Sequence, residues 1–157
     1  MGYEIDLVHL PAQKAAVIRA RVGHNGIGDF LGQAFGEVMS AVGEQGLHPA
    51  GPPFGRYRPT EEGGWDVEAG FPVSAEPTES GRVQATILPA GSAAHTTHVG
   101  DYGSLGAAYQ AVADWIVAKG MAPSGDPWEC YLDEPGVANP RTEVYFPCVP
   151  RADAPQD

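Results

Sequence analysis

The chain has few basic residues. Only nine lysines and arginines stand against twenty aspartates and glutamates, which gives a formal net charge of −11. Because nucleic acids and anionic membranes are bound through basic faces, this balance argues against both as direct partners. It favours cationic ligands, whose local concentration rises in the field of an acidic protein, although acidity also serves solubility alone.

Cysteine is almost absent, and no arrangement of residues predicts a metal site. Cys130 and Cys148 are the only cysteines, without a Cys-x-x-Cys motif, and hairpin counting places Cys130 nearer Val144 than Cys148. His95 and His98 are three residues apart in an expected strand, so their side chains point to opposite faces and do not share a metal. We expect no disulfide, no metal and no cofactor.

Long apolar runs are also missing. No segment has the length and hydrophobicity of a membrane span, and the start MGYEIDLVHL contains acids where a secretory signal has an apolar centre. We therefore expect a cytoplasmic protein. Apolar residues nevertheless make up 43% of the chain, which is enough for one folded domain over residues 1–150 with a frayed tail at 151–157.

The sequence contains an internal repeat. Leu-Pro-Ala occurs at residues 10–12 and again at 88–90, and the segment 46–57 matches the segment 120–131 at five positions. Composition alone gives about one such match. A third block follows in the same order and pairs Glu68, Phe71 and Pro72 with Glu143, Phe146 and Pro147. These blocks indicate a duplication.

Both halves of the repeat show the same order of elements. Half one covers about residues 3–73, half two about 83–149, and the polar segment 74–82 between them is the expected linker. Each half contains an extended segment (15–22; 93–99), a helix (29–44; 104–119), a strand ending at a tyrosine (57; 131) and a final strand (65–73; 142–149). The prediction is an α+β fold made of two β-α-β-β units about a pseudo-twofold axis, with an antiparallel sheet packed on two helices and a central ligand cleft.

The two helices have matching apolar stripes with helical spacing. The expected stripe residues are Leu31, Ala34, Phe35, Val38, Met39 and Val42 in the first helix and Leu105, Ala108, Tyr109, Val112, Ala113 and Ile116 in the second. Asp29 and Ser104 have the side chains of N-caps, and Gly46 and Gly120 fit the positions that follow helix ends.

The final strands alternate between apolar and polar side chains. In residues 142–146, Glu143 and Tyr145 share the face opposite Val144 and Phe146, which we expect to face a helix.

In residues 65–71 the same alternation puts Asp66 and Glu68 opposite the helix-facing side chains, and the repeat makes Glu68 equivalent to Glu143. If these faces line a groove, two carboxylates lie near its axis. A partly buried carboxylate can neutralise a cationic ligand or, with a raised pKa, act as a base. The alternative is that both belong to the solvated face of a half-buried strand.

Aromatic residues gather at the same strand ends. We expect these rings to line the ligand site: Phe54, Tyr57, Trp65, Trp128, Tyr131 and Tyr145. Flat rings beside a carboxylate suit planar or cationic ligands through stacking and cation–π contacts. Phe35 and Tyr109 are equivalent helix positions and further candidates, although core packing is the favoured role for these two. For Trp65 and Trp128, a place in the core and a place in the pocket stay equally open.

Several motifs together resemble the GyrI-like small-molecule-binding domain family. They are Leu88-Pro89-Ala90-Gly91, His98-Val99-Gly100-Asp101-Tyr102, Tyr109, Trp115-Ile116, Gly120, Glu129-Cys130-Tyr131-Leu132, Pro135, Thr142-Glu143-Val144-Tyr145-Phe146-Pro147, and the mid-chain strand 66–73. The similarity extends from about Tyr3 to Pro150.

The resemblance implies a bacterial protein with a cleft at the pseudo-axis, in which Glu143 contacts bound cations. The expected ligands are lipophilic, often cationic or planar, xenobiotics. Multidrug-sensing regulators fuse such a domain to a DNA-binding module, and no helix-turn-helix precedes Tyr3 here. We expect a free-standing form, monomeric or weakly dimeric, without direct DNA binding.

The family resemblance leaves two other functions open. Some free-standing members hydrolyse cyclopropane-bearing genotoxins, and in that case Glu143 and Tyr145 are the catalytic candidates. The family's namesake inhibits gyrase, and a strongly acidic surface can imitate DNA. Binding alone is the favoured interpretation.

Overall fold

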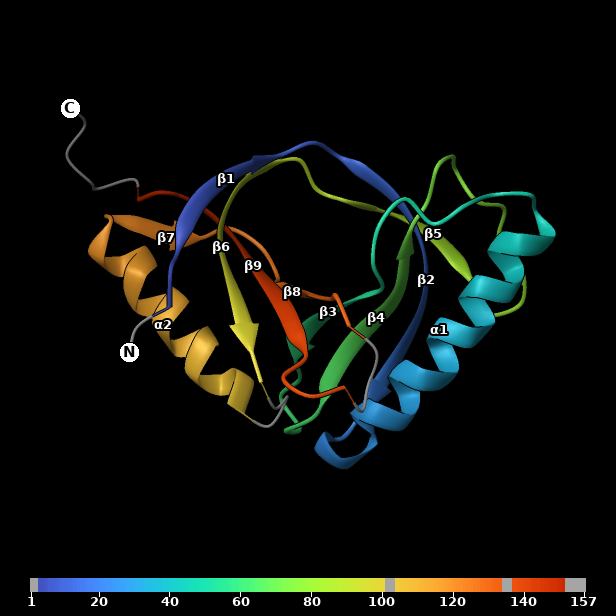
Figure 1. Cartoon of the computed structure of the whole chain (residues 1–157), viewed down its shortest axis with the longest axis horizontal. Helices are drawn as coiled ribbons and strands as arrows, with labels where there is room; N and C mark the ends of the chain where they lie inside the picture. The colour runs from blue at the N-terminus through green and yellow to red at the C-terminus, as the bar shows by residue number, and fades with distance from the viewer. Residues whose placement is uncertain (1–2, 101–103, 134–136, 152–157) are drawn as a thin grey trace. The chain divides into compact units, whose positions relative to one another are not determined.

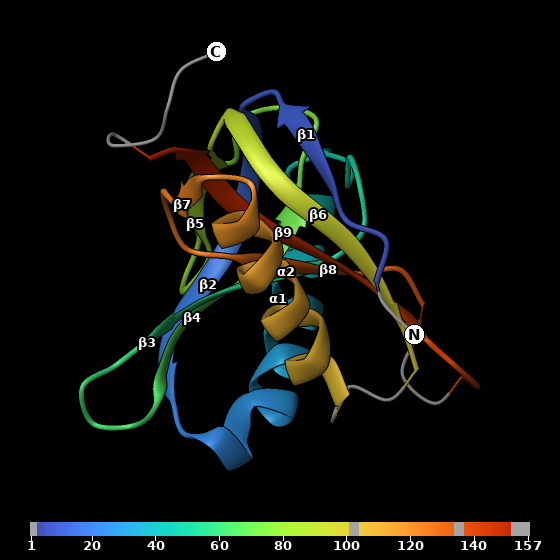
Figure 2. The same cartoon turned by 90° about the vertical axis from the view of Figure 1, so that its left-hand side faces the viewer.

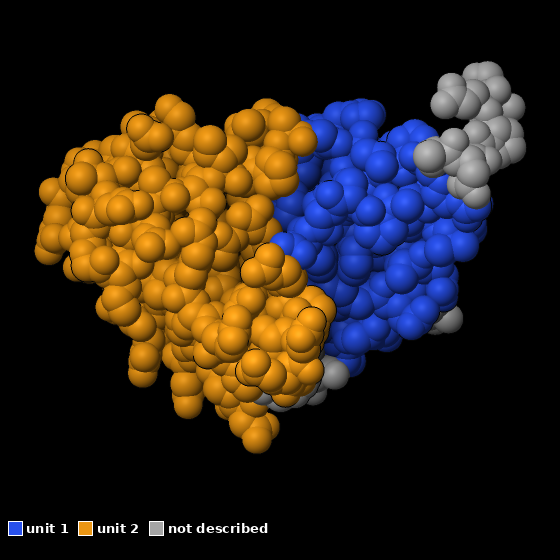
Figure 3. Space-filling view, turned by 180° about the vertical axis from the view of Figure 1, so that it is seen from behind, with its two compact units in different colours: residues 1–10, 91–157 blue, residues 11–90 orange. Residues whose placement is uncertain are grey.

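The computed structural model describes residues 3–100, 104–133 and 137–151. The chain divides into two compact units, one made of residues 11–90 (unit 2) and the other of residues 1–10 and 91–157 (unit 1), as coloured in Figure 3. Each unit contains an antiparallel sheet and one long helix, which confirms the α+β prediction. No described helix has the length and hydropathy needed to cross a bilayer.

Unit 2 has a four-stranded antiparallel sheet in the order β3-β4-β2-β5. The strands are β2 (Gln13–Val22), β3 (Phe54–Pro59), β4 (Trp65–Pro72) and β5 (Gln84–Leu88). After a short 3-10 helix, η1 (His24–Gly26), α1 (Ile27–Glu44) packs along β2 and β4 (Figure 1). Its core joins alternate residues of β2 and β4 to the buried face of α1, including Ile18, Phe71 and Val38.

Unit 1 has the sheet order β1-β6-β9-β8, and the short β7 pairs with the far end of β9. The strands are β1 (Asp6–Leu10), β6 (Gly91–Val99), β7 (Met121–Pro123), β8 (Trp128–Tyr131) and β9 (Arg141–Pro150). The helix α2 (Leu105–Ala118) packs on β6, β7 and β9, and Figure 2 shows it in front of them. Val112, Ile116 and Cys148 lie in this core with Phe146 beside them.

The predicted strand faces are confirmed in both units. Val67, Ala69 and Phe71 lie in the core beneath α1, and Phe146 packs in the core beneath α2. Glu68 and Glu143 therefore lie on the sheet faces that no helix of their own unit covers.

The predicted helix ends are only partly correct. Gly46 and Gly120 follow the last helical turns with φ of 71° each, the left-handed conformation expected of a residue after a helix. Asp29 is wrong as an N-cap because α1 begins earlier and Gly26 occupies that position. Ser104 does occupy the N-cap of α2, but its side chain makes no capping hydrogen bond, and its Oγ lies 3.0 Å from His98 Nε2.

The apolar stripe of α1 is rotated slightly from its predicted centre. Phe30 and Ala41 are buried, whereas Met39 is 41% exposed. In α2 the predicted Leu105, Ala108, Val112 and Ile116 are buried, whereas the predicted Ala113 is exposed.

The leading strands β1 and β5 are paired across the repeat. β1 ends at Leu10 and pairs with β6, whereas β5 ends at Leu88 and pairs with β2. The two Leu-Pro-Ala motifs therefore lie where the chain passes from one compact unit to the other. The segment 74–82, expected as a linker, belongs to unit 2, where Gln45, the residue that follows α1, and Thr78 exchange two hydrogen bonds.

Candidate functional site

The helix-free face of the unit 1 sheet carries a row of four side chains, one from each strand. Asp6 pairs with His95, His95 with Tyr145, and Tyr145 with Trp128. Directly paired residues of antiparallel strands point to the same face, so β1, β6, β9 and β8 each contribute one member. The next row contains Thr97, Glu143 and Cys130.

Glu143 is held by a histidine of the first row. His95 Nε2 lies 2.9 Å from Glu143 Oε2, and the side chains are 19% and 25% exposed. The other ring nitrogen of His95 lies 3.7 Å from the exposed Asp6 carboxylate. Glu143 is thus a partly buried carboxylate that solvent still reaches.

Aromatic rings adjoin this carboxylate. Tyr145 stacks on Trp128 with centroids 5.6 Å apart and planes inclined by 20°, and its ring lies 4.8 Å from that of His95. Trp128 is only 4% exposed, so it is the buried member of this stack. Burial, followed by the charge of Glu143, raises the pKa of Tyr145 above its ordinary value and keeps the phenol neutral.

The cross-strand neighbours of Glu143 carry no positive charge. Thr97 and Cys130 flank it on β6 and β8. Burial, with the nearby charges of Glu143 and Glu129, raises the pKa of the Cys130 thiol to about 12. Both cysteines of the chain are free thiols.

The equivalent carboxylate in unit 2 is neutralised by two arginines. Glu68 pairs across the sheet with Arg19 on one side and Arg56 on the other, and both guanidinium groups form salt bridges with it. Glu68 and Arg56 are 17% and 18% exposed, so this cluster is more sheltered than an ordinary surface pair. Structural equivalence in the repeat has therefore not preserved the charge environment.

A second row extends the arginine cluster. Asp66 lies between Arg21 and Arg58, at 3.1 Å and 3.2 Å respectively. Hydrogen bonds from Arg21 and then Arg58 lower the pKa of the Asp66 carboxyl. Four of the chain's nine lysines and arginines thus form salt bridges with two carboxylates of unit 2.

Another carboxylate lies on the α2 side of the unit 1 sheet. Glu129 is 8% exposed and accepts hydrogen bonds from the hydroxyl groups of Tyr109 and Tyr131. Burial raises its pKa, and the two hydrogen bonds oppose that rise. His98 acts on it electrostatically and is itself hydrogen-bonded to Tyr3. Sequence reasoning named the two tyrosines but not Glu129, because strand alternation alone assigned Glu129 no partner.

The predicted aromatic residues of unit 2 lie in two places. Tyr57 and Trp65 meet edge to face at 6.2 Å at the margin of the core beneath α1, and Phe35 packs in the same way against Phe71 at 5.8 Å. Phe54 is fully buried and shares its strand face with Arg56. All of these rings belong to unit 2, so none of them contributes to the group of side chains around Glu143 in unit 1. The cleft expected between the halves stays a prediction.

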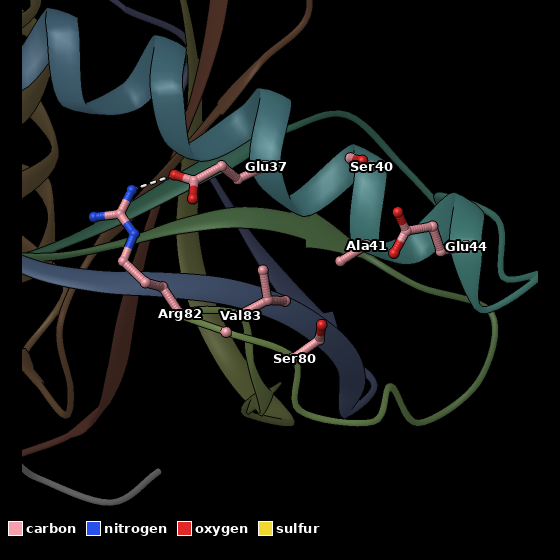
Figure 4. A pocket seen from close by; sticks show the side chains of 8 residues that line it. Glu37, Ser40, Ala41, Glu44, Ser80, Arg82 and Val83 are labelled. Atoms are coloured by element: carbon pink, nitrogen blue, oxygen red, sulfur yellow. Dashed lines mark hydrogen bonds and ion pairs between the residues drawn. The ribbon is translucent and has the colours of Figure 1, made fainter.

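A shallow concavity of about 220 Å³ lies elsewhere, between α1 and the turn before β5 (Figure 4). Glu37, Ser40 and Glu44 line it from the helix, and Arg82, which forms a salt bridge with Glu37, closes the opposite side. It contains none of the predicted site residues. Among the described residues, no group of three or more histidine, cysteine or acidic side chains could hold a metal ion.

Solved structures with the same fold cover nearly all of the chain. The crystal structure of the EcmrR C-terminal domain has a TM-score of 0.83 at 23% identity, covering 96% of this chain and 100% of that domain. The cryo-EM structure of the EcmrR–DNA complex gives 0.81 at 24% identity, covering 95% of this chain but 58% of EcmrR. The chain thus spans little more than half of EcmrR and all of its C-terminal domain.

A more distant structure contains a bound compound. SAV2435 bound to tetraphenylphosphonium has a TM-score of 0.67 at 14% identity, covering 93% of this chain and 94% of that one. Comparison with curated proteins gave no match. The GyrI-like small molecule binding domain model matches residues 3–149, so the predicted resemblance is confirmed and the chain belongs to the GyrI-like family.

Proposed function

We propose that this chain binds lipophilic, cationic or planar small molecules in the bacterial cytoplasm, with Glu143 as the residue that recognises charge. One observation carries the proposal. Glu143 is a partly buried carboxylate beside the Tyr145–Trp128 ring stack, and its cross-strand neighbours are neutral.

The chemistry of this face suits a large, weakly hydrated cation. A carboxylate at the edge of an apolar surface attracts such a cation without the full cost of stripping water from a small ion. Each ring contact adds about 0.5–1.5 kcal/mol beyond burial. Micromolar affinity corresponds to about 8 kcal/mol, which a few ring contacts and one charge contact supply together with the apolar area buried.

The relatives support the same ligand class. The family model describes a small-molecule-binding domain, and SAV2435, which has the same fold, was solved with the lipophilic cation tetraphenylphosphonium. That cation is therefore the first probe for this chain.

The test is calorimetric titration of tetraphenylphosphonium into three proteins at pH 8: wild type, Glu143→Gln and Glu68→Gln. We expect Glu143→Gln to weaken binding about tenfold or more, because the amide keeps the shape and removes the charge. Glu68→Gln is the matched control, since Glu68 holds the equivalent strand position but is already paired with two arginines. Thermal unfolding checks that both variants remain folded, and equal affinity of all three proteins would remove Glu143 from the proposal.

A fourth protein, Glu129→Gln, separates the two carboxylates of unit 1. Glu129 is buried with its oxygens engaged by two tyrosine hydroxyls, so we expect its replacement to change tetraphenylphosphonium affinity less than replacement of Glu143. The reverse result would assign the charge recognition to the α2 side of the sheet.

A hydrolytic activity is the second candidate, and one contact favours it. The His95–Glu143 pair, with the Tyr145 ring against His95, places a carboxylate, an imidazole and a phenol together, and the carboxylate or the imidazole can act as the general base that activates water. Incubation of a cyclopropane-bearing electrophile with one hundredth of an equivalent of protein decides between the functions. Turnover of many equivalents indicates an enzyme, whereas protection limited to one equivalent indicates binding alone.

A further inference from the structure

We infer that the charge state of His95 controls whether Glu143 can accept a cationic ligand. A neutral imidazole allows this face to bind permanent cations tightly, and a protonated imidazole weakens that binding. The inference rests on the proposed function, since it assigns a control to the same carboxylate. It begins from the contact of 2.9 Å between His95 Nε2 and Glu143 Oε2.

The contact has a different meaning in the two charge states of the imidazole. A neutral His95 donates one hydrogen bond and leaves the negative charge of Glu143 in place. A protonated His95 forms an internal ion pair with it, and a ligand cation must then compete with a cation already in contact. Both side chains are at least three-quarters buried, so solvent screens this competition only in part.

The other titratable and charged groups around this pair come from β9, β8 and β1. From β9, Tyr145 stays neutral because burial raises its pKa, and Arg141 stays protonated beside Asp133. From β8, Cys130 stays neutral with a pKa of about 12. From β1, Asp6 faces the second ring nitrogen of His95 but is 69% exposed, so water screens its charge. Within the described residues, His95 is thus the imidazole in direct contact with Glu143.

In unit 2 the equivalent glutamate has different basic partners. There the equivalent carboxylate, Glu68, is neutralised at every physiological pH by Arg19 and Arg56. In unit 1 the corresponding cross-strand positions hold Thr97 and Cys130, and the basic side chain that contacts Glu143 is a histidine. Glu68 thus contacts two arginines, whereas Glu143 contacts a histidine, and Arg141 of β9 interacts with Glu143 electrostatically without contacting it.

Linkage gives the inference a second observable. If protonation of His95 weakens cation binding, then cation binding must weaken proton binding at His95 by the same coupling free energy. Protons are then released when the cation binds. Tetraphenylphosphonium has no titratable proton, so any proton released on its binding comes from the protein.

The experiment is calorimetric titration of tetraphenylphosphonium into the full chain at pH 5.5, 6.5, 7.5 and 8.5, in two buffers of different ionisation enthalpy. For wild type we expect affinity to rise roughly tenfold across this range and proton release to appear at the lower pH values. His95→Gln keeps a donor for Glu143 but cannot titrate, so its affinity should be nearly constant with pH and its proton release absent.

Two controls isolate the effect. His9→Gln replaces an exposed histidine of β1 whose Nδ1 lies 3.1 Å from Ser92 Oγ, and it should retain the wild-type pH profile. Neutral triphenylphosphine oxide, a probe of similar shape without charge, should bind wild type with little pH dependence.

The failures are distinguishable. Wild-type affinity that does not change with pH, or an unchanged profile in His95→Gln, would overturn the control by His95 and leave the proposed receptor intact. Absence of tetraphenylphosphonium binding at every pH would overturn the proposed function and this inference together.

Discussion

Cys130 illustrates how a single side chain reports on its surroundings. It lies opposite Glu143 on β8, and burial together with the charges of Glu143 and Glu129 raises its pKa to about 12. An unfolded chain loses this proton near pH 9, so the thiol's contribution to folding stability is complete below pH 9 and declines as the pH rises from there towards 12. The thiolate is thus suppressed in the folded protein at neutral pH.

We predict that Cys130 of the folded protein reacts with iodoacetamide at pH 8 at least a hundredfold more slowly than in denaturant. The shift from the ordinary value of 9.0 to about 12 lowers the thiolate population about a thousandfold. Mass spectrometry of peptides after timed labelling gives the rate at Cys130 separately from that at Cys148. Glu143→Gln should accelerate labelling of Cys130, and similar rates with and without denaturant would refute the predicted environment.

For single residues, the sequence pattern predicted the strand face of a side chain better than its contacts across the sheet. Strand alternation placed Glu143 and Tyr145 on one face, and it placed Glu68 on the equivalent face of the other half. It could not show that Glu68 meets two arginines while Glu143 meets His95, because cross-strand partners depend on the register between strands distant in sequence. His95 was considered only as a metal ligand and was therefore missed.

The helix ends show the repeat at the level of elements. Gly46 and Gly120 follow α1 and α2 with the same φ of 71°, and their N–H groups donate to the carbonyl oxygens of Gly43 and Val117. A residue with a Cβ is strained in this left-handed conformation. Both helices are therefore followed by a glycine that can adopt the left-handed backbone conformation without strain.

We predict that Gly46→Ala and Gly120→Ala each lower the free energy of unfolding by about 1 kcal/mol. Gly43→Ala is the matched control, because Gly43 lies within the last turn of α1 with open space where a Cβ would lie, and it should stabilise by up to about 1 kcal/mol. Urea unfolding followed by circular dichroism measures all three. A destabilisation of Gly43→Ala equal to that of Gly46→Ala would contradict the assignment of the helix end.

Elements with strong local signals were predicted within a few residues, and those without were missed. Both helices and the final strands have clear periodicity, and glycines follow the ends of both helices. The strands β1 and β5 are five residues each and lie at the edge of their sheets, so they offer little alternation to detect. The strand β7, of three residues, depends on pairing with β9 and has no local pattern of its own.

The whole chain is divided by contacts rather than by sequence order. Unit 2 takes its edge strand β5 from beyond the segment 74–82, and unit 1 takes β1 from the start of the chain. Val83 and Leu88, each 4% exposed, are buried although they follow the expected linker. A cut at that linker would therefore remove an edge strand from each unit.

We predict that the fragment of residues 11–90 is more stable than the equally long fragment of residues 1–80. The first contains every strand of unit 2, whereas the second lacks β5 and the burial of Val83 and Leu88, a loss of roughly 3 kcal/mol or more. Hydrogen exchange of β2 amides compares the two fragments directly. Equal protection in both would show that β5 contributes nothing to the unit.

The exchange of the strands β1 and β5 between the two copies of the repeat has a further consequence for how one copy could fold. β1 and β5 each end at the leucine of a Leu-Pro-Ala motif, and each pairs with the strand that follows the motif in the other copy. In a polypeptide with one copy, no such second copy exists within the chain, so the same pairing requires two molecules that swap their first strands. The repeat thus places within one chain a strand exchange that would otherwise take two molecules, and its two copies differ in the partners of their equivalent glutamates: arginines contact Glu68, whereas a histidine contacts Glu143.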